Sequence, residues 1–256
     1  MSEGKKEILL GDCLELMKDI PNGSIDMILC DLPYGTTKNK WDAVIPFNDL
    51  WDNYKRVIKE SGAIVLFGSQ PFTTDLINSN RKDFRYEIIW DKKMVTGFAT
   101  CKVQPMKCHE NIIVFYSKKP TYNPQLRAVK KPFGKILDGI KSENYGDLVN
   151  NGKRGVGYPK TIIEFSKPNN LSKDGNLHPT QKPIGLIEWL VKTFTNENEI
   201  VLDNCAGSGT TAIACLNTKR KFIVMEKEQK YYDIILKRVG DFNKNFEPQT
   251  LFGNDM

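Results

Sequence analysis

The chain has 256 residues, of which 40% are hydrophobic and 27% charged, and a formal net charge of +6. This composition is ordinary for a globular protein with its own core, and it excludes a disordered chain or a small disulfide framework. No apolar stretch approaches the roughly 20 residues that span a bilayer, and the amino terminus has no apolar run typical of a signal peptide. We therefore expect a cytoplasmic protein with reduced cysteines, no membrane association and no metal site.

Short apolar runs alternate along the chain with segments of helical spacing. The runs predict strands at 8–10, 25–30, 63–67, 112–116, 200–202 and 222–225. The helical spacing predicts helices at 50–60, 186–194, 211–216 and 231–239. Strands that alternate with helices favour a mostly parallel sheet covered on both faces, which is a doubly wound α/β fold. Its ligands are expected at the carboxyl ends of the strands.

The stretch 118–176 departs from this alternation. Its apolar periodicity is weak, and Gly, Pro, Asn and Lys are frequent. A structureless loop of this length is unusual inside a compact domain, so we interpret it as an inserted lobe between a main domain formed by 1–117 and 177–256. The lobe is basic and carries interleaved aromatic residues, which favours nucleic-acid contacts, although a solvated lysine-rich insertion would look similar. The candidate phosphate contacts are Lys130, Lys131, Lys153 and Arg154.

The segment Asp31-Leu32-Pro33-Tyr34 follows the predicted strand 25–30 directly. The exocyclic amine of a base is a poor nucleophile, because its lone pair is delocalised into the ring. The carboxylate of Asp31 can accept one N–H of such an amine, and the backbone carbonyl of Pro33 can accept the other. Tyr34 offers a ring on which an extruded base can stack. The alternative is a proline turn capped by an aspartate.

A second motif lies in 200–211, which has the pattern of a strand, a glycine turn and the start of a helix. Gly207 and Gly209 allow a sharp bend and close approach to a ligand. Glu226 ends the next predicted strand, where an acid can accept hydrogen bonds from ribose hydroxyls. The pattern predicts a nucleotide-like cofactor, but any strand–glycine–helix turn would look alike. It is neither a P-loop nor a full dinucleotide fingerprint.

The order of these motifs resembles the permuted, beta class of DNA amino-methyltransferases. In that class an Asp-Pro-Pro-Tyr motif comes first, followed by a target-recognition region, a His-Pro-Thr-x-Lys-Pro segment and the cofactor loop. This chain has Asp31–Tyr34, then the lobe, then His178-Pro179-Thr180-Gln181-Lys182-Pro183, then 203–211. The resemblance implies a Rossmann-like methyltransferase sheet, S-adenosylmethionine as the cofactor and N6 of adenine in DNA as the target.

Carried over by residue, the resemblance assigns Asp31, Pro33 and Tyr34 to the target base. The residues that it assigns to the cofactor are Asp12, Thr180, Lys182, Asp203, Gly207, Gly209, Thr210, Thr211 and Glu226. Lys182 is implied to pair with the carboxylate of the methionine. Asp12 is matched to the acid at the cofactor adenine, although a helix cap is an alternative. Leu32 departs from the family's first proline, and Cys205 departs from its frequent phenylalanine.

Other activities remain open at this point. The same site suits N4 of cytosine, although the family favours Asp for adenine and Ser for cytosine. Methylation of RNA or of a protein glutamine is less favoured, because those relatives usually have the unpermuted order. A cytosine-C5 enzyme is excluded, because no Pro-Cys pair occurs. The other class is a catalytically silent DNA-binding module. The expected partner is double-stranded DNA, with a homodimer and a separate restriction endonuclease as further expectations.

Overall fold

The computed structural model describes residues 6–36, 42–128, 141–142, 146–147, 156–167 and 181–246. Contacts divide the chain into two units. One consists of Met1–Asn123 and Thr161–Met256, and the other of Pro124–Lys160. We describe each unit by itself.

The first unit is built on a single mixed sheet with the strand order β1-β12-β11-β2-β3-β5-β4-β10. The strands are β1 (Lys6–Leu10), β2 (Ile25–Cys30), β3 (Ile58–Gly68), β4 (Phe84–Thr96), β5 (Lys107–Phe115), β10 (Ile162–Glu164), β11 (Ile200–Asp203) and β12 (Lys221–Glu226). All of these strands run in one direction except β5, which is antiparallel to both β3 and β4. Their carboxyl ends therefore meet at one edge of the sheet.

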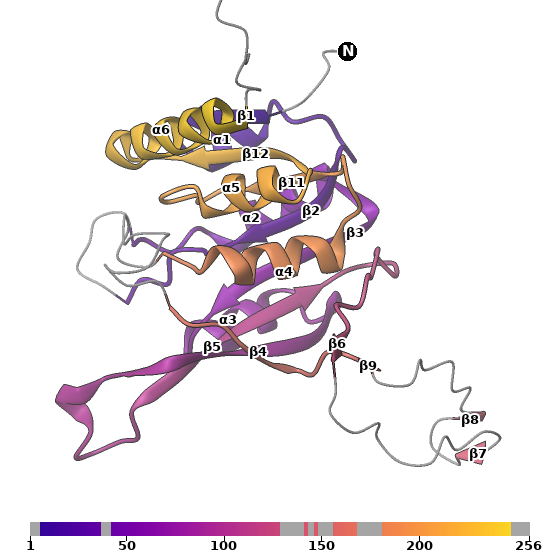
Figure 1. Cartoon of the computed structure of the whole chain (residues 1–256), viewed down its shortest axis with the longest axis vertical. Helices are drawn as coiled ribbons and strands as arrows, with labels where there is room; N and C mark the ends of the chain where they lie inside the picture. The colour runs from indigo at the N-terminus through magenta and orange to yellow at the C-terminus, as the bar shows by residue number, and fades with distance from the viewer. Residues whose placement is uncertain are drawn as a thin grey trace, which may run out of the picture. The chain divides into compact units, whose positions relative to one another are not determined.

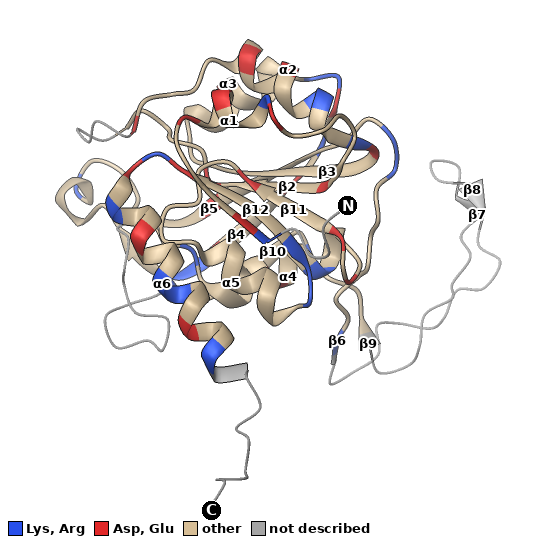
Figure 2. Ribbon diagram, turned by 90° about the horizontal axis from the view of Figure 1, so that it is seen from above, with Lys and Arg blue, Asp and Glu red and all other residues tan. Residues whose placement is uncertain are grey.

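Helices cover both faces of this sheet, as Figure 2 shows. One face carries α1 (Cys13–Met17), α2 (Phe47–Val57) and α3 (Phe72–Ser79), and the other carries α4 (Ile184–Phe194), α5 (Thr210–Asn217) and α6 (Gln229–Phe246). Within the described part of the chain, no helix is long and apolar enough to cross a membrane.

Alternate side chains of the central strands pack into two separate hydrophobic cores, one on each face of the sheet. On β2, Met27 and Leu29 pack with the core under α4 and α5, whereas Ile28 and Cys30 pack with the core under α2. Each of these side chains is at most 1% exposed. A strand buried on both faces reads as a continuous apolar run, which is why the segment Ile25–Cys30 was recognisable.

The predicted doubly wound α/β fold is confirmed, and each predicted strand and helix of the main domain has a counterpart. One boundary was wrong. The predicted helix 50–60 ends at Val57, and the chain enters β3 at Ile58. The structure adds α1, α3, β4 and β10, which the sequence did not predict. The strand β10 falls inside the range 118–176, but it pairs with β4 in the main sheet.

The second unit contains two short antiparallel pairs. In one, β6 (Arg127–Ala128) pairs with β9 (Val156–Gly157), and in the other β7 (Lys141–Ser142) pairs with β8 (Gly146–Asp147). The four predicted phosphate contacts, Lys130, Lys131, Lys153 and Arg154, lie outside the described residues. The predicted bounds of the lobe and its role in recognising DNA stay predictions.

Candidate active site

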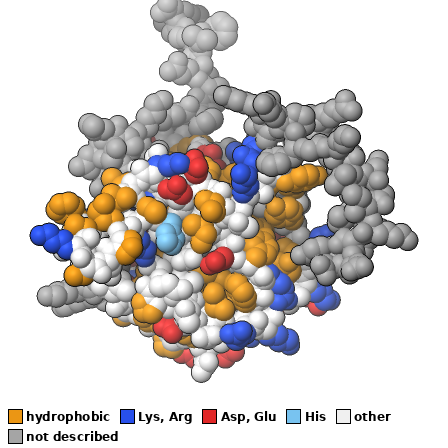
Figure 3. Space-filling view, turned by 90° about the horizontal axis from the view of Figure 1, so that it is seen from below, with side chains coloured by type: hydrophobic (Ala, Val, Ile, Leu, Met, Phe, Trp, Pro, Cys, Tyr) orange, Lys and Arg blue, Asp and Glu red, His pale blue; other side chains and the backbone are white. Residues whose placement is uncertain are grey.

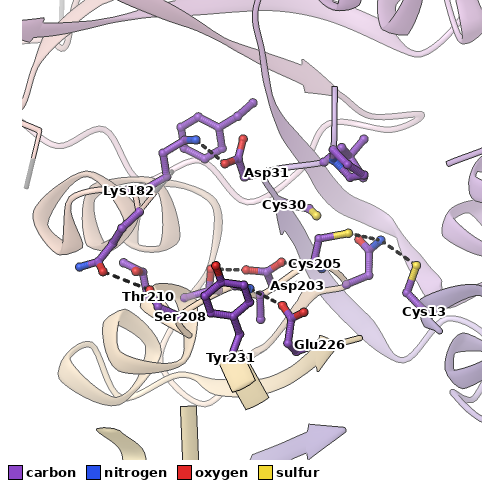
Figure 4. Close-up of a pocket in the computed structure, with 18 of the residues that line it drawn as sticks. Cys13, Cys30, Asp31, Lys182, Asp203, Cys205, Ser208, Thr210, Glu226 and Tyr231 are labelled. Atoms are coloured by element: carbon purple, nitrogen blue, oxygen red, sulfur yellow. Dashed lines mark hydrogen bonds and ion pairs between the residues drawn. The ribbon is translucent and has the colours of Figure 1, made fainter. Parts of the chain in front are cut away.

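A cavity of about 320 Å³ lies at the carboxyl edge of the main sheet. This volume is at the lower end of the range typical of small-molecule sites. The cavity is lined by the residues that follow β1 and β2, by the loop between β11 and α5, and by the end of β12. The Asp-Leu-Pro-Tyr segment and the glycine loop therefore share one cavity, although they are about 170 residues apart in the sequence. Figure 4 shows the labelled residues that line it.

Asp31 follows the last residue of β2, and its carboxylate has two side-chain partners. Its Oδ1 accepts a hydrogen bond of 2.7 Å from the hydroxyl of Tyr34, and its Oδ2 pairs with the ammonium of Lys182. Burial raises the pKa of Asp31, and the two partners only partly offset this. A more basic carboxylate is a better acceptor for the N–H of a weakly acidic amine.

The charge of Lys182 is balanced by a second acid that the sequence did not predict. Glu110 on β5 lies 3.4 Å from the ammonium of Lys182 and 3.3 Å from that of Lys92 on β4. Burial lowers the pKa of Lys182, but the charges of Asp31 and Glu110 outweigh it and the pKa is raised. Two acids and two lysines thus form a continuous chain of ion pairs from β4 to Asp31. Buried charges require this kind of pairing.

Tyr34 is held between Asp31 and a neighbouring ring. Its ring stacks on Phe72 of α3 with centroids 4.9 Å apart, and it also lines the cavity with Pro33. Leu32, at the position where the family has its first proline, is buried in the core under α2. Leu32 therefore packs in this core and also adds an apolar surface to the cavity.

The glycine loop follows β11 as predicted. Gly207 and Gly209 both have positive φ, at 54° and 77°, which a side chain strongly disfavours. A Cβ on Gly209 would also lie 2.9 Å from Ile235 on α6. Asp203 stabilises the loop through two hydrogen bonds. Its Oδ2 accepts one from the Thr211 hydroxyl at 2.5 Å, and its Oδ1 accepts one from the Cys205 N–H at 3.1 Å. Burial raises the pKa of Asp203 to about 6.

Glu226 ends β12 and accepts backbone hydrogen bonds with both oxygens, from the N–H of Gly207 at 2.8 Å and of Glu228 at 2.9 Å. Asp12 lines the cavity and also caps α1, because its Oδ1 accepts from the N–H of Leu14 at 3.0 Å. Each acid therefore shapes the backbone of the cavity wall as well as facing the cavity. The helix-cap alternative for Asp12 is present in the structure.

The His-Pro-Thr-Gln-Lys-Pro segment meets the glycine loop at one hydrogen bond, 3.2 Å long, between Gln181 and the hydroxyl of Ser208. Thr210 also lines the cavity, at the first position of α5. Thr180 lies outside the described residues. All but one of the other predicted catalytic and cofactor residues line this one cavity, namely Asp12, Asp31, Pro33, Tyr34, Lys182, Asp203, Gly207, Thr210, Thr211 and Glu226. The exception is Gly209, which precedes α5 as its N-cap.

Cys205, together with aromatic residues and two further cysteines that the sequence did not single out, completes the wall. Phe67, Trp90 and Tyr231 line the cavity from β3, β4 and α6. Three cysteines, Cys13, Cys30 and Cys205, also line it, and Asn204 contacts the sulfur atoms of Cys13 and Cys205 at 3.5 and 3.6 Å. Burial raises the pKa of Cys30 to about 12, so its thiol stays protonated at neutral pH. A buried, protonated thiol is a poor nucleophile.

Comparison with known families decides the class of the protein. The family model described as DNA methylase, which covers N6 and N4 enzymes, matches residues 25–237. The chain belongs to this family of DNA methylases. The match spans both the Asp-Leu-Pro-Tyr segment and the glycine loop, so the predicted activity of a DNA amino-methyltransferase is confirmed, whereas membership of the permuted, beta class stays a prediction.

Curated relatives are similar over most of their length. The Type II methyltransferase M1.MboII of Moraxella bovis is 27% identical, with 86% of this chain and 91% of the relative covered. M.BglII of Bacillus subtilis is 30% identical, with 94% and 71% covered. The DNA adenine methyltransferase YhdJ of Escherichia coli is 29% identical, with 91% and 82% covered.

Solved structures share the fold of this DNA methylase. The complex of M1.HpyAVI with SAM is 24% identical at a TM-score of 0.62, with 91% of this chain and 98% of that one covered. The cytosine-N4-specific PvuII DNA methyltransferase is 14% identical at a TM-score of 0.68, with 98% and 88% covered. The Rossmann-like architecture predicted for the sheet is therefore confirmed.

Proposed function

We propose that this DNA methylase transfers a methyl group from S-adenosylmethionine to N6 of adenine in double-stranded DNA. The observation that carries the proposal is the shared cavity, in which the carboxylate of Asp31 and the glycine loop at Gly207 line the same space. The cavity thereby brings together a carboxylate that can bind an amine and a loop that suits a nucleotide-like cofactor.

The residues of the cavity fit S-adenosylmethionine. Glu226 and Asp12 provide carboxylate acceptors for the ribose and the adenine, and Gly207 brings backbone without a side chain to the cavity wall. Lys182 provides a cation for the methionine carboxylate. Tyr231 supplies an aromatic surface to the cavity, where Cys205 lacks the ring that the family often has. Bound S-adenosylmethionine supplies an electrophilic methyl group on a sulfonium sulfur.

The residues of this chain prepare the amine for that methyl group. Asp31 accepts one N–H and the carbonyl of Pro33 accepts the other, which turns the nitrogen lone pair out of the ring. When the nitrogen gains the methyl group it must lose a proton, and Asp31 is placed to accept it. Tyr34 holds the Asp31 carboxylate through its hydroxyl and offers its ring to the extruded base.

Adenine is favoured over cytosine for two reasons. The motif begins with Asp31, as is usual in adenine enzymes of this class, and the relative YhdJ is named a DNA adenine methyltransferase. The fold itself does not discriminate, since a neighbour of known structure is cytosine-N4-specific. We also propose a separate restriction endonuclease as a partner, because several relatives are named Type II methyltransferases. A homodimer is proposed from the family resemblance alone.

The test is base-resolved mapping of methylation in DNA from cells that express the chain, with an Asp31→Asn variant as the matched control. We expect N6-methyladenine at one short recurring sequence with the parent and none with the variant. N4-methylcytosine instead would overturn the choice of base. Modified adenine in both samples would remove Asp31 from the reaction.

The same variant separates the two halves of the cavity. Calorimetric titration of Asp31→Asn with S-adenosylmethionine should give an affinity close to that of the parent. Within the described residues, no hydrogen bond or ion pair joins Asp31 to the glycine loop, and Glu110 still pairs with Lys182 when the Asp31 charge is removed. A large loss of cofactor affinity together with activity would contradict this separation of roles.

A further inference from the structure

A long hairpin leaves the main sheet beside the active site. We call residues 93–107, which join β4 to β5, the hairpin arm. The last residue of β3, Gly68, faces Asn111 on β5, and Asn111 faces Ile89 on β4. The strand β4 nevertheless continues to Thr96. At about 3.3 Å per residue, the arm reaches on the order of 20 Å past the end of β3, and Figure 1 shows it projecting from the body of the unit.

The arm is anchored at the catalytic cavity. Trp90 and Glu110, which flank its root on β4 and β5, line the cavity. Lys107 donates a hydrogen bond to the hydroxyl of Ser69, just after β3, and Lys93 forms an ion pair of 2.8 Å with Glu164 on β10. These contacts fix the root of the arm relative to Asp31, and they place the arm on the edge of the sheet where the target base must enter.

The tip of the arm is closed by backbone hydrogen bonds and exposes apolar side chains. Gly97 adopts a positive φ of 87°, and backbone hydrogen bonds close the turn from Phe98 to Val103. Every residue from 93 to 106 is exposed. Phe98 is 81% exposed and Val103 84%, and Met94, Val95 and Met106 add to the same surface. Figure 3 shows apolar side chains beside lysines at the left of this face. A cluster of this kind marks an interaction surface.

The charge of the arm favours a polyanion over an acidic or neutral partner. Its lysines are Lys93, Lys102 and Lys107, and it contains no aspartate or glutamate. Lys93 is already paired with Glu164, so Lys102 at the exposed tip is the cation best placed to reach a phosphate. An apolar tip flanked by lysine suits a duplex, because apolar side chains can wedge between bases while cations hold the backbone.

We propose that the hairpin arm contacts the DNA duplex beside the target base, with Phe98 and Val103 packed against the bases and Lys102 on a phosphate. The inference rests on the proposed function, since it requires duplex DNA to enter the cavity at Asp31. Extrusion of a base leaves unstacked neighbours, and an apolar side chain that covers them lowers the cost of extrusion. The arm thereby supports methyl transfer without touching the cofactor.

The test uses a double variant of the arm, Phe98→Ala with Lys102→Ala. Both side chains are exposed, Phe98 to 81%, so the fold should not depend on them. The matched control is Leu236→Ala with Lys237→Ala, which removes one exposed apolar side chain and one exposed lysine from α6. Each protein is titrated with a duplex that contains the mapped target site, at several salt concentrations, and with S-adenosylmethionine. The fluorescence of 2-aminopurine at the target position reports extrusion.

We expect the arm variant to bind the duplex about tenfold more weakly than the parent, with reduced extrusion and a salt slope lower by about 0.9. Its cofactor affinity and the behaviour of the control should match the parent. Equal duplex binding and extrusion by the arm variant and the control would overturn the proposal. Light scattering that shows a dimer lost in the arm variant, with duplex binding unchanged, would assign the arm to a second copy of the chain. A parent that methylates no DNA would instead overturn the proposed function.

Discussion

At the scale of single residues, Tyr34 has two roles that one substitution can separate. Its hydroxyl donates to Asp31 at 2.7 Å, whereas its ring lines the cavity. The hydrogen bond stabilises the ionised form of Asp31 and thereby lowers its pKa. Removing the hydroxyl should therefore weaken the placement of the carboxylate while leaving the stacking surface intact.

We expect Tyr34→Phe to slow methyl transfer about tenfold, which corresponds to the loss of one hydrogen bond to a charged group. Tyr34→Ala should slow methyl transfer further, by a factor that corresponds to the loss of roughly 1–3 kcal/mol of base stacking. Because the pKa of Asp31 rises when the hydroxyl is removed, the acid limb of the pH–rate profile should move to higher pH in Tyr34→Phe. An unchanged acid limb would show that the hydroxyl does not act on Asp31.

The protonation of Asp203 makes the free energy of unfolding depend on pH. Burial raises the pKa of Asp203 from 3.8 to about 6. Between these values the folded protein binds more protons at this group than the unfolded chain does, so the free energy of unfolding falls as the pH rises from 4 to 6. In Asp203→Asn this contribution disappears, while an acceptor for Thr211 is retained.

The measurement is urea unfolding at pH 4.5 and pH 6.5. We take the free energy of unfolding of the parent minus that of Asp203→Asn at each pH. We expect this difference to be smaller at pH 6.5 than at pH 4.5. The difference isolates Asp203 from Asp31 and Glu226, whose pKa values burial also raises. A difference that does not change with pH would show that Asp203 titrates normally.

At the scale of elements, Glu226 links the end of β12 to the glycine loop. One of its oxygens accepts the N–H of Gly207 in the loop, and the other accepts the N–H of Glu228 before α6. A ligand hydroxyl would use the remaining lone pairs of the same carboxylate. The acid therefore acts on the cofactor directly and also through the shape of the loop.

We expect Glu226→Ala to weaken S-adenosylmethionine binding by about 1.5–3 kcal/mol, as for the loss of hydrogen bonds to a charged group. The affinity of Glu226→Gln for S-adenosylmethionine should lie between those of Glu226→Ala and the parent, since an amide oxygen retains one acceptor. The matched control is Glu188→Ala on α4, outside the cavity. Calorimetric titration that gives the parental affinity for Glu226→Ala would remove this residue from the ribose.

The elements that the sequence predicted are those whose local pattern is strong. Ile112–Phe115 and Val201–Leu202 are apolar runs because their strands are covered on both faces. The strand β4 was missed because only part of it is buried. Ile88 and Trp90 lie in the core, whereas the buried Lys92 and the exposed carboxyl end that starts at Lys93 break the apolar pattern. Its pairing with β5 comes from the tertiary fold and leaves no local periodicity.

The site followed the same rule. Asp31 and Gly207 belong to motifs that are contiguous in the sequence, and so they were found. Glu110 has a role only because Lys182, 72 residues later, is brought to 3.4 Å from it. Its one local signal is an acid within β5 directly before the buried run Asn111–Phe115, which is consistent with a solvated strand end as well.

At the scale of the whole molecule, the net charge of +6 comes from the range 118–176, which has 12 lysines and arginines against 5 aspartates and glutamates, so that the rest of the chain is close to neutral. General attraction between a basic protein and DNA does not depend on where the charges lie. Recognition by a lobe does depend on it, because only phosphates within reach release their counterions. These two possibilities predict different responses to the same number of lost charges.

We expect replacement of Lys130, Lys131, Lys153 and Arg154 by Ala to weaken duplex binding and flatten its salt dependence. Each lost phosphate contact should reduce the slope of log K against log salt by roughly 0.9. Binding of S-adenosylmethionine should be unchanged, because the glycine loop and Lys182 lie outside 118–176. Fluorescence anisotropy with labelled duplex and calorimetric titration with the cofactor measure the two quantities.

The control removes the same charge elsewhere, by replacing four exposed lysines of the main unit by Ala, namely Lys55, Lys219, Lys230 and Lys237. If DNA is recognised by the lobe, these substitutions should leave the salt slope close to that of the parent. If they flatten it as much as the lobe substitutions do, binding follows net charge and the lobe does not recognise the DNA. Because Phe98 and Lys102 are intact in both proteins, a contribution from the hairpin arm is common to them and does not affect the comparison.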